Sequence, residues 1–254
     1  MEDTLRYRDA GGHETAAVLA APDQRTDKIV VLCHGFLSTK NSSTNKALTR
    51  LLLAQGIATF RFDFFGQGDS QGPFERLLLS TAVAQTRGAL DEVAARGYRR
   101  IGLMGSSFGG LVATLVASGR PDLRAVGLKC PVPDFPEMLR MEFGEAGIEA
   151  WRKFGRIPDV TGGTKPVPLH FAFYDDLLRH DAYKAAERIT APVLIVQGDC
   201  DEHVPMSQAR RLMESLRSEK RLDVIEGADH SFSKAADFQR MSAALADWFT
   251  RHLS

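Results

Sequence analysis

A serine lies in a short glycine-rich segment that has the residue types and the spacing of a nucleophile. Residues 105–110 read GSSFGG, after an apolar run that ends at Met104 and before a run of small apolar residues. Where a strand turns sharply into a helix, a serine at the bend is strained, and the positions two before and two after it have no room for side chains. Gly105 and Gly109 meet this requirement. We therefore predict that Ser107 is a nucleophile, with an ordinary glycine-rich turn as the alternative.

A serine hydroxyl needs a base to become a good nucleophile, and histidine is the usual base. Of the 7 histidines, His230 lies in residues 226–232 (EGADHSF), between the last strand-like run and the C-terminal helical pattern. In a parallel sheet that loop emerges at the carboxyl edge, where Ser107 also lies. The other histidines lie near the termini, in an irregular central region or beside other loops. We therefore predict that His230 is the base.

The carboxylate that orients such a histidine should follow another strand, between the serine and the histidine along the chain. Residues 198–205 (GDCDEHVP) follow an apolar run and offer Asp199, Asp201 and Glu202. We favour Asp201, which stands three residues before Val204-Pro205, where the chain must turn into the next helix. Its task would be to hold one imidazole tautomer and to stabilise the imidazolium. Asp199 and Glu202 are the alternatives.

Two backbone N–H groups should stabilise the oxyanion that forms during acyl transfer. One is the N–H of Phe108, the residue after the nucleophile. The second should come from residues 34–38 (HGFLS), which follow the first long apolar run. Gly35 lets this backbone approach closely, and we predict the N–H of Phe36 as the donor. We expect His34 to brace the loop rather than to titrate in catalysis.

Short apolar runs alternate with amphipathic helical patterns along most of the chain, which predicts a mostly parallel sheet covered on both faces. The runs are 28–33, 56–62, 100–104, 125–128, 192–197 and 221–225. The helical patterns are 45–55, 81–96, 108–118, 207–217 and 235–252. Residues 4–8 and 15–20, with Gly11-Gly12 between them, predict an antiparallel hairpin at one edge of the sheet.

Residues 131–183 interrupt this alternation and contain six prolines but no clear strand. A segment of this length without regular pattern is usually functional, so we predict a lid over the site. The alternative is a small subdomain whose aromatic side chains fill only its own core. The candidate substrate-pocket residues of this segment are Phe135, Phe143, Trp151, Phe154, Phe171 and Phe173.

The composition is that of an ordinary soluble domain, with 254 residues of which 44% are hydrophobic and 25% charged. The 32 basic and 32 acidic residues balance, which gives no electrostatic reason to expect nucleic acid or an anionic membrane as a partner. The first residues lack the apolar core of a signal peptide, so we expect a cytoplasmic protein. Three widely spaced cysteines, Cys33, Cys130 and Cys200, argue against a disulfide framework.

Several segments, taken in order, resemble the α/β-hydrolase superfamily over nearly the whole chain. They are 34–36 (HGF), 61–70 (RFDFFGQGDS), 105–109 (GSSFG), 198–201 (GDCD) with 204–205, and 227–230 (GADH). The chain is most similar to the small bacterial esterases that include the cinnamoyl and feruloyl esterases. Gln67 departs from the pattern, because many relatives have histidine between the two glycines.

The resemblance implies one domain over residues 1–254, with an eight-stranded, mostly parallel sheet and a short insertion, residues 131–183, after the sixth strand. It also implies the triad Ser107, Asp201 and His230 with Phe36 and Phe108 as oxyanion donors. We expect a serine carboxylesterase-type hydrolase that cleaves esters of small to medium acyl groups, including aromatic, hydroxycinnamoyl-like ones. The alternatives are an amidase or peptidase using the same triad, and a non-catalytic binding protein.

We expect no cofactor and no metal. Acidic residues and histidines are grouped in the two loops that follow residues 192–197 and 221–225. We interpret these loops as carrying the acid and the base of the triad rather than the ligands of a metal. A small-molecule ester is the expected partner, and the sequence leaves open whether the chain forms a homodimer.

Overall fold

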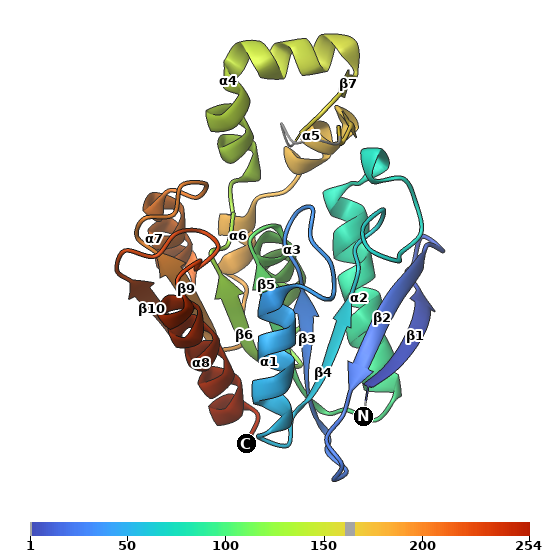
Figure 1. Ribbon diagram of the computed structural model, residues 1–254, viewed down its shortest axis with the longest axis vertical. Coiled ribbons are helices and arrows are strands. Elements are labelled where there is room, and N and C mark those ends of the chain that lie inside the picture. The colour runs from blue at the N-terminus through green and yellow to red at the C-terminus, as the bar shows by residue number, and fades with distance from the viewer. Residues whose placement is uncertain (1, 161–165) are drawn as a thin grey trace.

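The computed structural model describes residues 2–160 and 166–254, and its centre is an eight-stranded sheet (Figure 1). The strand order is β1 (Glu2–Arg8), β2 (Glu14–Ala20), β4 (Ala58–Phe62), β3 (Lys28–Cys33), β5 (Arg100–Ser106), β6 (Leu123–Lys129), β9 (Val193–Gly198) and β10 (Lys220–Ile225). The strands from β4 to β10 are parallel, and β1 and β2 form the expected antiparallel hairpin at one edge. The predicted fold class is therefore confirmed, and the ends of the predicted strands and helices differ from the observed ones by at most two residues.

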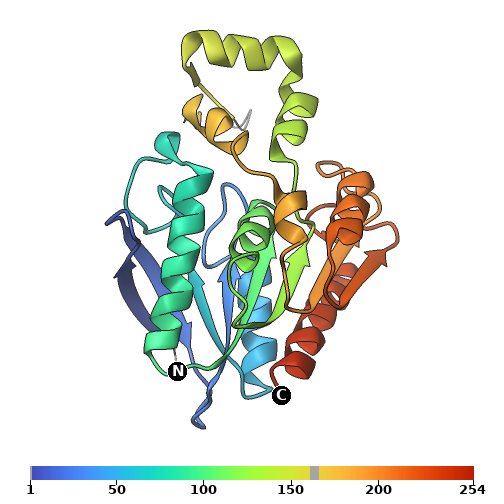
Figure 2. The same cartoon turned by 180° about the vertical axis from the view of Figure 1, so that it is seen from behind.

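Helices cover both faces of the sheet, because the central strands are apolar on both sides. On one face lie α1 (Ser43–Leu53) and α8 (Ala235–His252). On the other lie α2 (Leu79–Ala95), α3 (Phe108–Ala117), α6 (Ala182–Ala186) and α7 (Met206–Ser215) (Figure 2). Two apolar clusters therefore flank the sheet, and the parallel strands all end at one edge.

Residues 131–183 are here called the insertion, and their described part up to α5 lies beyond that edge of the sheet (Figures 1 and 2). They contain α4 (Phe135–Phe154), the paired two-residue strands β7 (Arg156–Ile157) and β8 (Leu169–His170), and α5 (Ala172–Leu177). The sequence pattern predicted neither these helices nor the small strand pair, because two-residue strands show no alternation and α4 bends at Gly144, whose φ is 67°.

The insertion is tied to the rest of the molecule by hydrogen bonds between Ser80 and the buried Asp176. The backbone N–H and the hydroxyl of Ser80 both donate to the carboxylate of Asp176, each at 2.7 Å. Within the insertion the indole of Trp151 donates to the carbonyl of Leu169 at 2.9 Å. The two bonds of Ser80 fix α5 against the start of α2, and the Trp151 bond joins α4 to β8.

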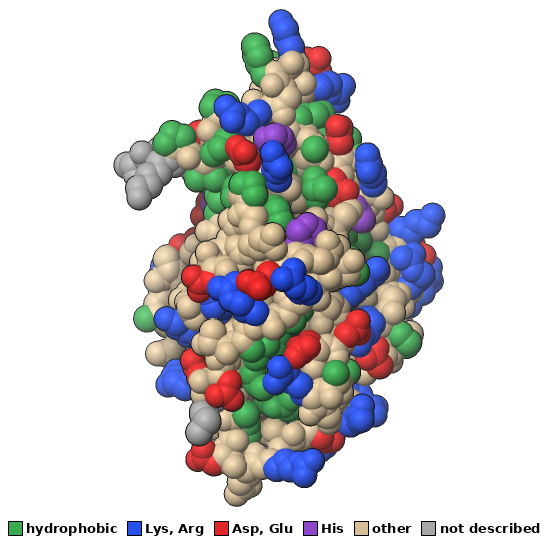
Figure 3. Space-filling view, turned by 90° about the vertical axis from the view of Figure 1, so that its right-hand side faces the viewer, with side chains coloured by type: hydrophobic (Ala, Val, Ile, Leu, Met, Phe, Trp, Pro, Cys, Tyr) green, Lys and Arg blue, Asp and Glu red, His purple; other side chains and the backbone are tan. Residues whose placement is uncertain are grey.

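Acidic and basic side chains are interspersed over the molecular face in Figure 3, as expected from the balanced composition. None of the described helices combines the length and the apolar character that a bilayer crossing requires.

Candidate active site

Ser107 lies between β5 and α3 with φ 53° and ψ −117°, a conformation that non-glycine residues rarely adopt. A Cβ placed on Gly105 would lie 2.1 Å from the carbonyl oxygen of Gly109. A Cβ on Gly109 would lie 2.4 Å from the carbonyl oxygen of His34. Side chains are therefore excluded from both flanking positions, for the reason that the GSSFGG pattern indicated. Such strain is typical of functional positions.

His230 and Asp201 are brought together by the two neighbouring strands β9 and β10. These strands are parallel and end with Gly198 opposite Ile225, so the loops that follow them are adjacent. A Cβ on Gly198 would lie only 2.3 Å from the carbonyl oxygen of Ala228, which shows how closely the loops pack. The Nδ1 atom of His230 lies 2.8 Å from the Oδ2 atom of Asp201.

The carboxylate of Asp201 accepts hydrogen bonds from four N–H groups and is almost fully buried. Besides His230, the donors are the Gln197 side chain and the backbone of His203 and Val204, at 2.8, 3.0 and 2.9 Å. Burial raises the pKa of Asp201, but the hydrogen bond and charge of His230 and the two backbone N–H groups outweigh it, so the pKa lies below its ordinary value. The group is therefore an anion that holds the imidazole in one orientation.

The two alternative acids have other partners. The carboxylate of Asp199 accepts the backbone N–H of Gly227 at 2.6 Å, at the surface. Glu202 accepts the backbone N–H of His230 at 3.1 Å rather than a ring nitrogen. Among the described residues, Asp201 is thus the carboxylate that contacts the imidazole of His230.

His34 is buried and supports the loop after β3, as expected. Its Nδ1 atom lies 2.7 Å from the carbonyl oxygen of Gly35, and its Nε2 atom accepts the backbone N–H of Phe64 at 3.1 Å. One ring nitrogen must therefore carry a proton and the other a lone pair, so the ring is neutral. Burial lowers the pKa of His34 to about 4.

The loop that His34 supports lies against the serine. A Cβ on Gly35 would be 3.4 Å from the Cβ of Ser107. Within the described part of the chain, the backbone N–H groups of Phe36 and Phe108 donate to no protein acceptor. Both predicted oxyanion donors are therefore free to bind a substrate oxygen.

Ser107 and His230 line the same cavity, which has a volume of about 230 Å³. Within residues 2–160 and 166–254 no hydrogen bond joins the Ser107 hydroxyl to a protein group. Catalytic hydrogen bonds of this kind often reach full strength only in the complex with substrate. The residues that line the cavity are Gly35, Phe36, Ser38, Ser42, Ser43, Thr44, Ser106, Ser107, Lys129, His230 and Ser231.

Lys129 and the start of α1 belong to this cavity, although the sequence reasoning missed them. Lys129 ends β6 and pairs in register with Ser106 of β5, so it reaches the edge where Ser107 lies. Its carbonyl accepts the N–H of Ser107 at 2.9 Å, and its Nζ donates to the carbonyl of His230 at 2.5 Å. A lysine directly after the apolar run 125–128 was the available signal.

The aromatic residues proposed for the substrate pocket fall into three groups. Phe135 and Phe173 are fully buried, with ring centroids 5.5 Å from that of Phe36 in both cases. The Trp151 ring lies 6.3 Å from the Phe143 ring and 5.7 Å from the Phe171 ring, centroid to centroid, within the insertion. The Phe154 side chain lies beside the Lys153 ammonium, is 74% exposed and is not among the residues that line the Ser107 cavity.

The three cysteines are free, as expected. Cys33 and Cys130 are buried, and burial raises the pKa of each thiol to about 12, whereas Cys200 is exposed. The sulfur of Cys130 lies within 4.8 Å of ligand atoms of Asp201 and His230. A metal there would have to displace the hydrogen bond between Asp201 and His230, so this grouping fits a hydrogen-bonded pair better than a metal site.

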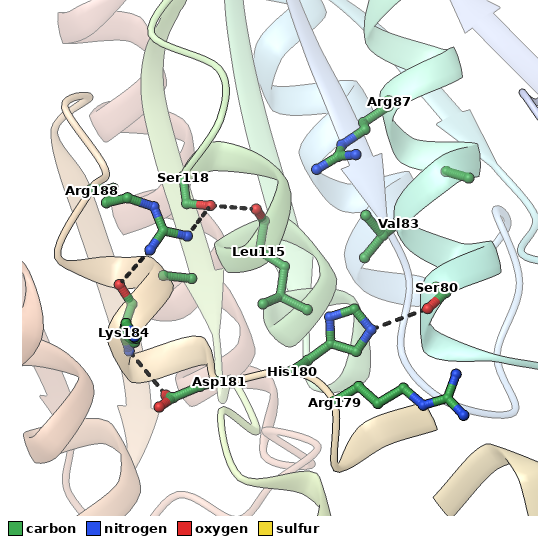
Figure 4. Close-up of a pocket in the computed structure, with 12 residues that line it drawn as sticks. Ser80, Val83, Arg87, Leu115, Ser118, Arg179, His180, Asp181, Lys184 and Arg188 are labelled. Carbon is green, nitrogen blue, oxygen red and sulfur yellow. Dashed lines mark hydrogen bonds between the residues drawn. The ribbon is translucent and has the colours of Figure 1, made fainter. Parts of the chain in front are cut away.

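A second cavity, of about 630 Å³, lies between α2, α3 and residues 179–188 (Figure 4). Figure 4 shows the His180 ring beside Ser80, with the Nε2 and Oγ atoms 3.1 Å apart. The cavity contains none of the three candidate triad residues. Because its cationic side chains are exposed and solvated, it indicates no ligand by itself. Those cations are Arg87, Arg179, Lys184 and Arg188.

A family model described as alpha/beta hydrolase family matches residues 30–247. The chain belongs to this family. Membership in this hydrolase family supports hydrolytic activity, and the sheet order and the strained serine turn agree with it.

Individual relatives are distant. The structure of Est1E from Butyrivibrio proteoclasticus with bound ferulic acid matches with a TM-score of 0.84 and 24% identity, over 97% of this chain and 98% of that one. A putative hydrolase from Agrobacterium vitis S4 matches with a TM-score of 0.86 and 23% identity, over 98% and 99%. The human mitochondrial palmitoyl-protein thioesterase ABHD10 is 23% identical over 86% of this chain and 72% of its own length. Structural likeness at this identity shows the fold alone.

Proposed function

We propose that the protein is a serine carboxylesterase-type hydrolase in which Ser107 is the nucleophile, His230 the base and Asp201 the orienting acid. The observation that carries the proposal is the 2.8 Å bond between Asp201 and His230, on a cavity wall that also holds the strained Ser107. Acyl transfer requires that the serine hydroxyl can pass its proton to an imidazole that is held in one orientation.

The reaction proceeds in two steps. The Nε2 atom of His230 takes the proton of Ser107 as the serine oxygen attacks the substrate carbonyl, and the free N–H groups of Phe36 and Phe108 bind the oxyanion. The imidazolium, stabilised by Asp201, protonates the leaving alcohol and an acyl-enzyme remains. Water then attacks the acyl carbon and loses its proton to His230. The bond from the acyl carbon to the Ser107 oxygen breaks, the imidazolium returns the proton to that oxygen, and the carboxylic acid leaves.

The acyl group is small to medium in size and includes aromatic, hydroxycinnamoyl-like groups. Phe36, which carries one oxyanion donor, packs against Phe135 and Phe173 of the insertion. The insertion acts as a lid whose rings border the acyl group. Ferulic acid, bound in the similar structure of Est1E, is an aromatic acid of this kind.

Labelling with a fluorophosphonate probe tests the nucleophile. We expect the wild-type chain to be labelled and Ser107→Ala to be unlabelled, with turnover of p-nitrophenyl acetate reduced at least about 10³-fold. Circular dichroism spectra should coincide, since α3 and β5 are unchanged. Turnover by Ser107→Ala near that of wild type would remove the assignment.

A substrate panel tests the class. We expect p-nitrophenyl esters of two to eight carbons and methyl ferulate to be hydrolysed faster than the matching anilides. Faster cleavage of the anilides would favour an amidase or peptidase, and no turnover with no labelling would favour a binding protein.

A further inference from the structure

The cavity beside Ser107 contains a buried ammonium group without a carboxylate partner. Lys129 is only 5% exposed, and its Nζ donates to the carbonyl oxygen of His230 and lies 5.3 Å from the centre of the Phe232 ring. Within the described residues no carboxylate oxygen lies within 4.0 Å of this ammonium. A buried cation retains donors and charge that a ligand can use.

Asp201 is an acid of the site, but no ion pair joins it to this ammonium within the described residues. Both groups lie beside Cys130 and act on its thiol with opposite charge. The oxygens of Asp201 already accept four N–H groups, and Lys129 is not one of the donors. The ammonium has three donors, the described residues supply one acceptor for it, and Lys129 lines the cavity.

The N-terminus of α1 borders the same cavity. Ser42 caps this 11-residue helix by accepting the N–H of Asn45, and the first turn contains no acidic residue. The backbone N–H groups of Ser43 and Thr44 donate to no acceptor in the described chain. Free N–H groups at a helix start, together with the helix dipole, favour an anion.

The two sides of Ser107 therefore differ in chemistry. The side chains of Lys129 and Ser106 emerge on the sheet face that α1 and α8 cover, where hydroxyl groups line the cavity. The phenyl rings of Phe108, Phe135 and Phe173 lie in the apolar cluster of the opposite face. An ester bound across Ser107 would have one apolar half and one polar half.

We propose that the polar side binds a carboxylate carried by the alcohol half of the ester, held by the Lys129 ammonium and by the free N–H groups of Ser43 and Thr44. This inference rests on the proposed esterase function and names its substrate class: esters of hydroxy acids. A single cation in the cavity wall matches the single charge of a carboxylate, and charge-assisted hydrogen bonds are the strong ones. The anion would fix the ester oxygen beside the imidazole of His230.

A matched pair of benzoate esters tests the proposal. Benzoyloxyacetate carries the carboxylate on its alcohol half, and benzoyloxyacetamide is its neutral counterpart. We expect the wild type to have a kcat/KM about tenfold higher for the acid, which corresponds to about 1.4 kcal/mol. Release of benzoate, measured by chromatography, gives both rates. Equal or inverted values would overturn the proposal.

Variants of Lys129 test whether the preference for the acid over the amide depends on the ammonium group of this residue. In Lys129→Met we expect kcat/KM to be about equal for the acid and the amide, whatever the overall activity. Lys129→Arg should keep most of the wild-type preference for the acid. The control is Lys46→Met, which removes one exposed charge from α1 outside the cavity and should keep the ratio. A preference that survives in Lys129→Met, or that falls equally in Lys46→Met, would contradict the assignment.

Equilibrium binding separates this proposal from the esterase function itself. Ser107→Ala cannot turn over substrate, so isothermal titration with the two esters reports recognition alone. Binding of the acid about tenfold tighter than the amide supports the anion subsite even if no ester is hydrolysed. Equal affinities, or no binding of either ester, would overturn the subsite while leaving probe labelling of Ser107 to decide the function.

Discussion

At the scale of single residues, the choice among three neighbouring acids depends on where each side chain points. Asp199, Asp201 and Glu202 are close in sequence, but Asp201 alone among them contacts the ring of His230. Asp199 instead accepts a backbone N–H of the histidine loop, a contact that shapes the loop without touching the imidazole. Substitutions of Asp201 and Asp199 should therefore differ in their effect on kcat.

We expect Asp201→Asn to lower kcat by about 10³- to 10⁴-fold, because an amide can favour the imidazole tautomer that cannot accept the serine proton. Asp199→Asn should lower kcat by less than about tenfold, since it loses one surface hydrogen bond. Steady-state rates with p-nitrophenyl acetate provide the comparison. If the two substitutions ranked in the opposite order, the acid would have to be reassigned.

At the scale of elements, the turn between β5 and α3 positions the nucleophile, and its glycines make the turn sterically feasible. The backbone at Gly105 packs against the carbonyl oxygen of Gly109, and the backbone at Gly109 packs against that of His34. The strain at Ser107 persists because both flanking elements are buried and fixed. Damage to this turn should therefore affect both stability and reactivity.

Gly105→Ala places a methyl group about 2.1 Å from a backbone oxygen, so something must shift. We expect a loss of several kcal/mol in the free energy of unfolding, measured with urea, and loss of probe labelling in any folded fraction. Gly119→Ala is the control, because its Cβ would have only one neighbour, at 4.0 Å. A wild-type free energy of unfolding for Gly105→Ala would refute the steric account.

At the scale of the whole molecule, burial lowers the pKa of His34, a residue that takes no part in the proposed acyl transfer. His34 is enclosed between the loop after β3 and the segment at Phe64, and burial holds its pKa at about 4 instead of 6.5. The unfolded chain binds this proton near pH 6.5 and the folded chain does not. The contribution of His34 to the free energy of unfolding is therefore fully present above pH 6.5 and is lost as the pH falls toward 4.

We expect the free energy of unfolding, from urea titrations at pH 7 and pH 5, to fall less steeply in His34→Gln than in wild type. The variant should also be less stable at pH 7, because glutamine cannot reproduce both ring contacts. His203→Gln, which alters an exposed histidine, should keep the wild-type slope. An unchanged slope in His34→Gln would show that another group carries the acid sensitivity.

The arrangement of the whole molecule also gives the site two unlike sides. Aromatic residues of the insertion lie on one side of Ser107, and hydroxyl groups, a helix start and Lys129 lie on the other. This asymmetry arises because successive residues of a strand point to opposite faces. It is the basis for proposing an aromatic acyl half and an acidic alcohol half in one substrate.

The sequence by itself determined the alternation of strands and helices outside the insertion and the glycine-flanked serine, because apolar runs, helical periodicity and steric exclusion around Ser107 are local properties. It also ranked His230 and Asp201 first, since loops after parallel strands share one edge. Only the tertiary structure decided that Asp201 rather than Asp199 meets the imidazole. It alone revealed the helices of the insertion, and it alone placed Lys129 and the start of α1 beside Ser107. These depend on register and packing between segments far apart in the chain, which no local pattern encodes.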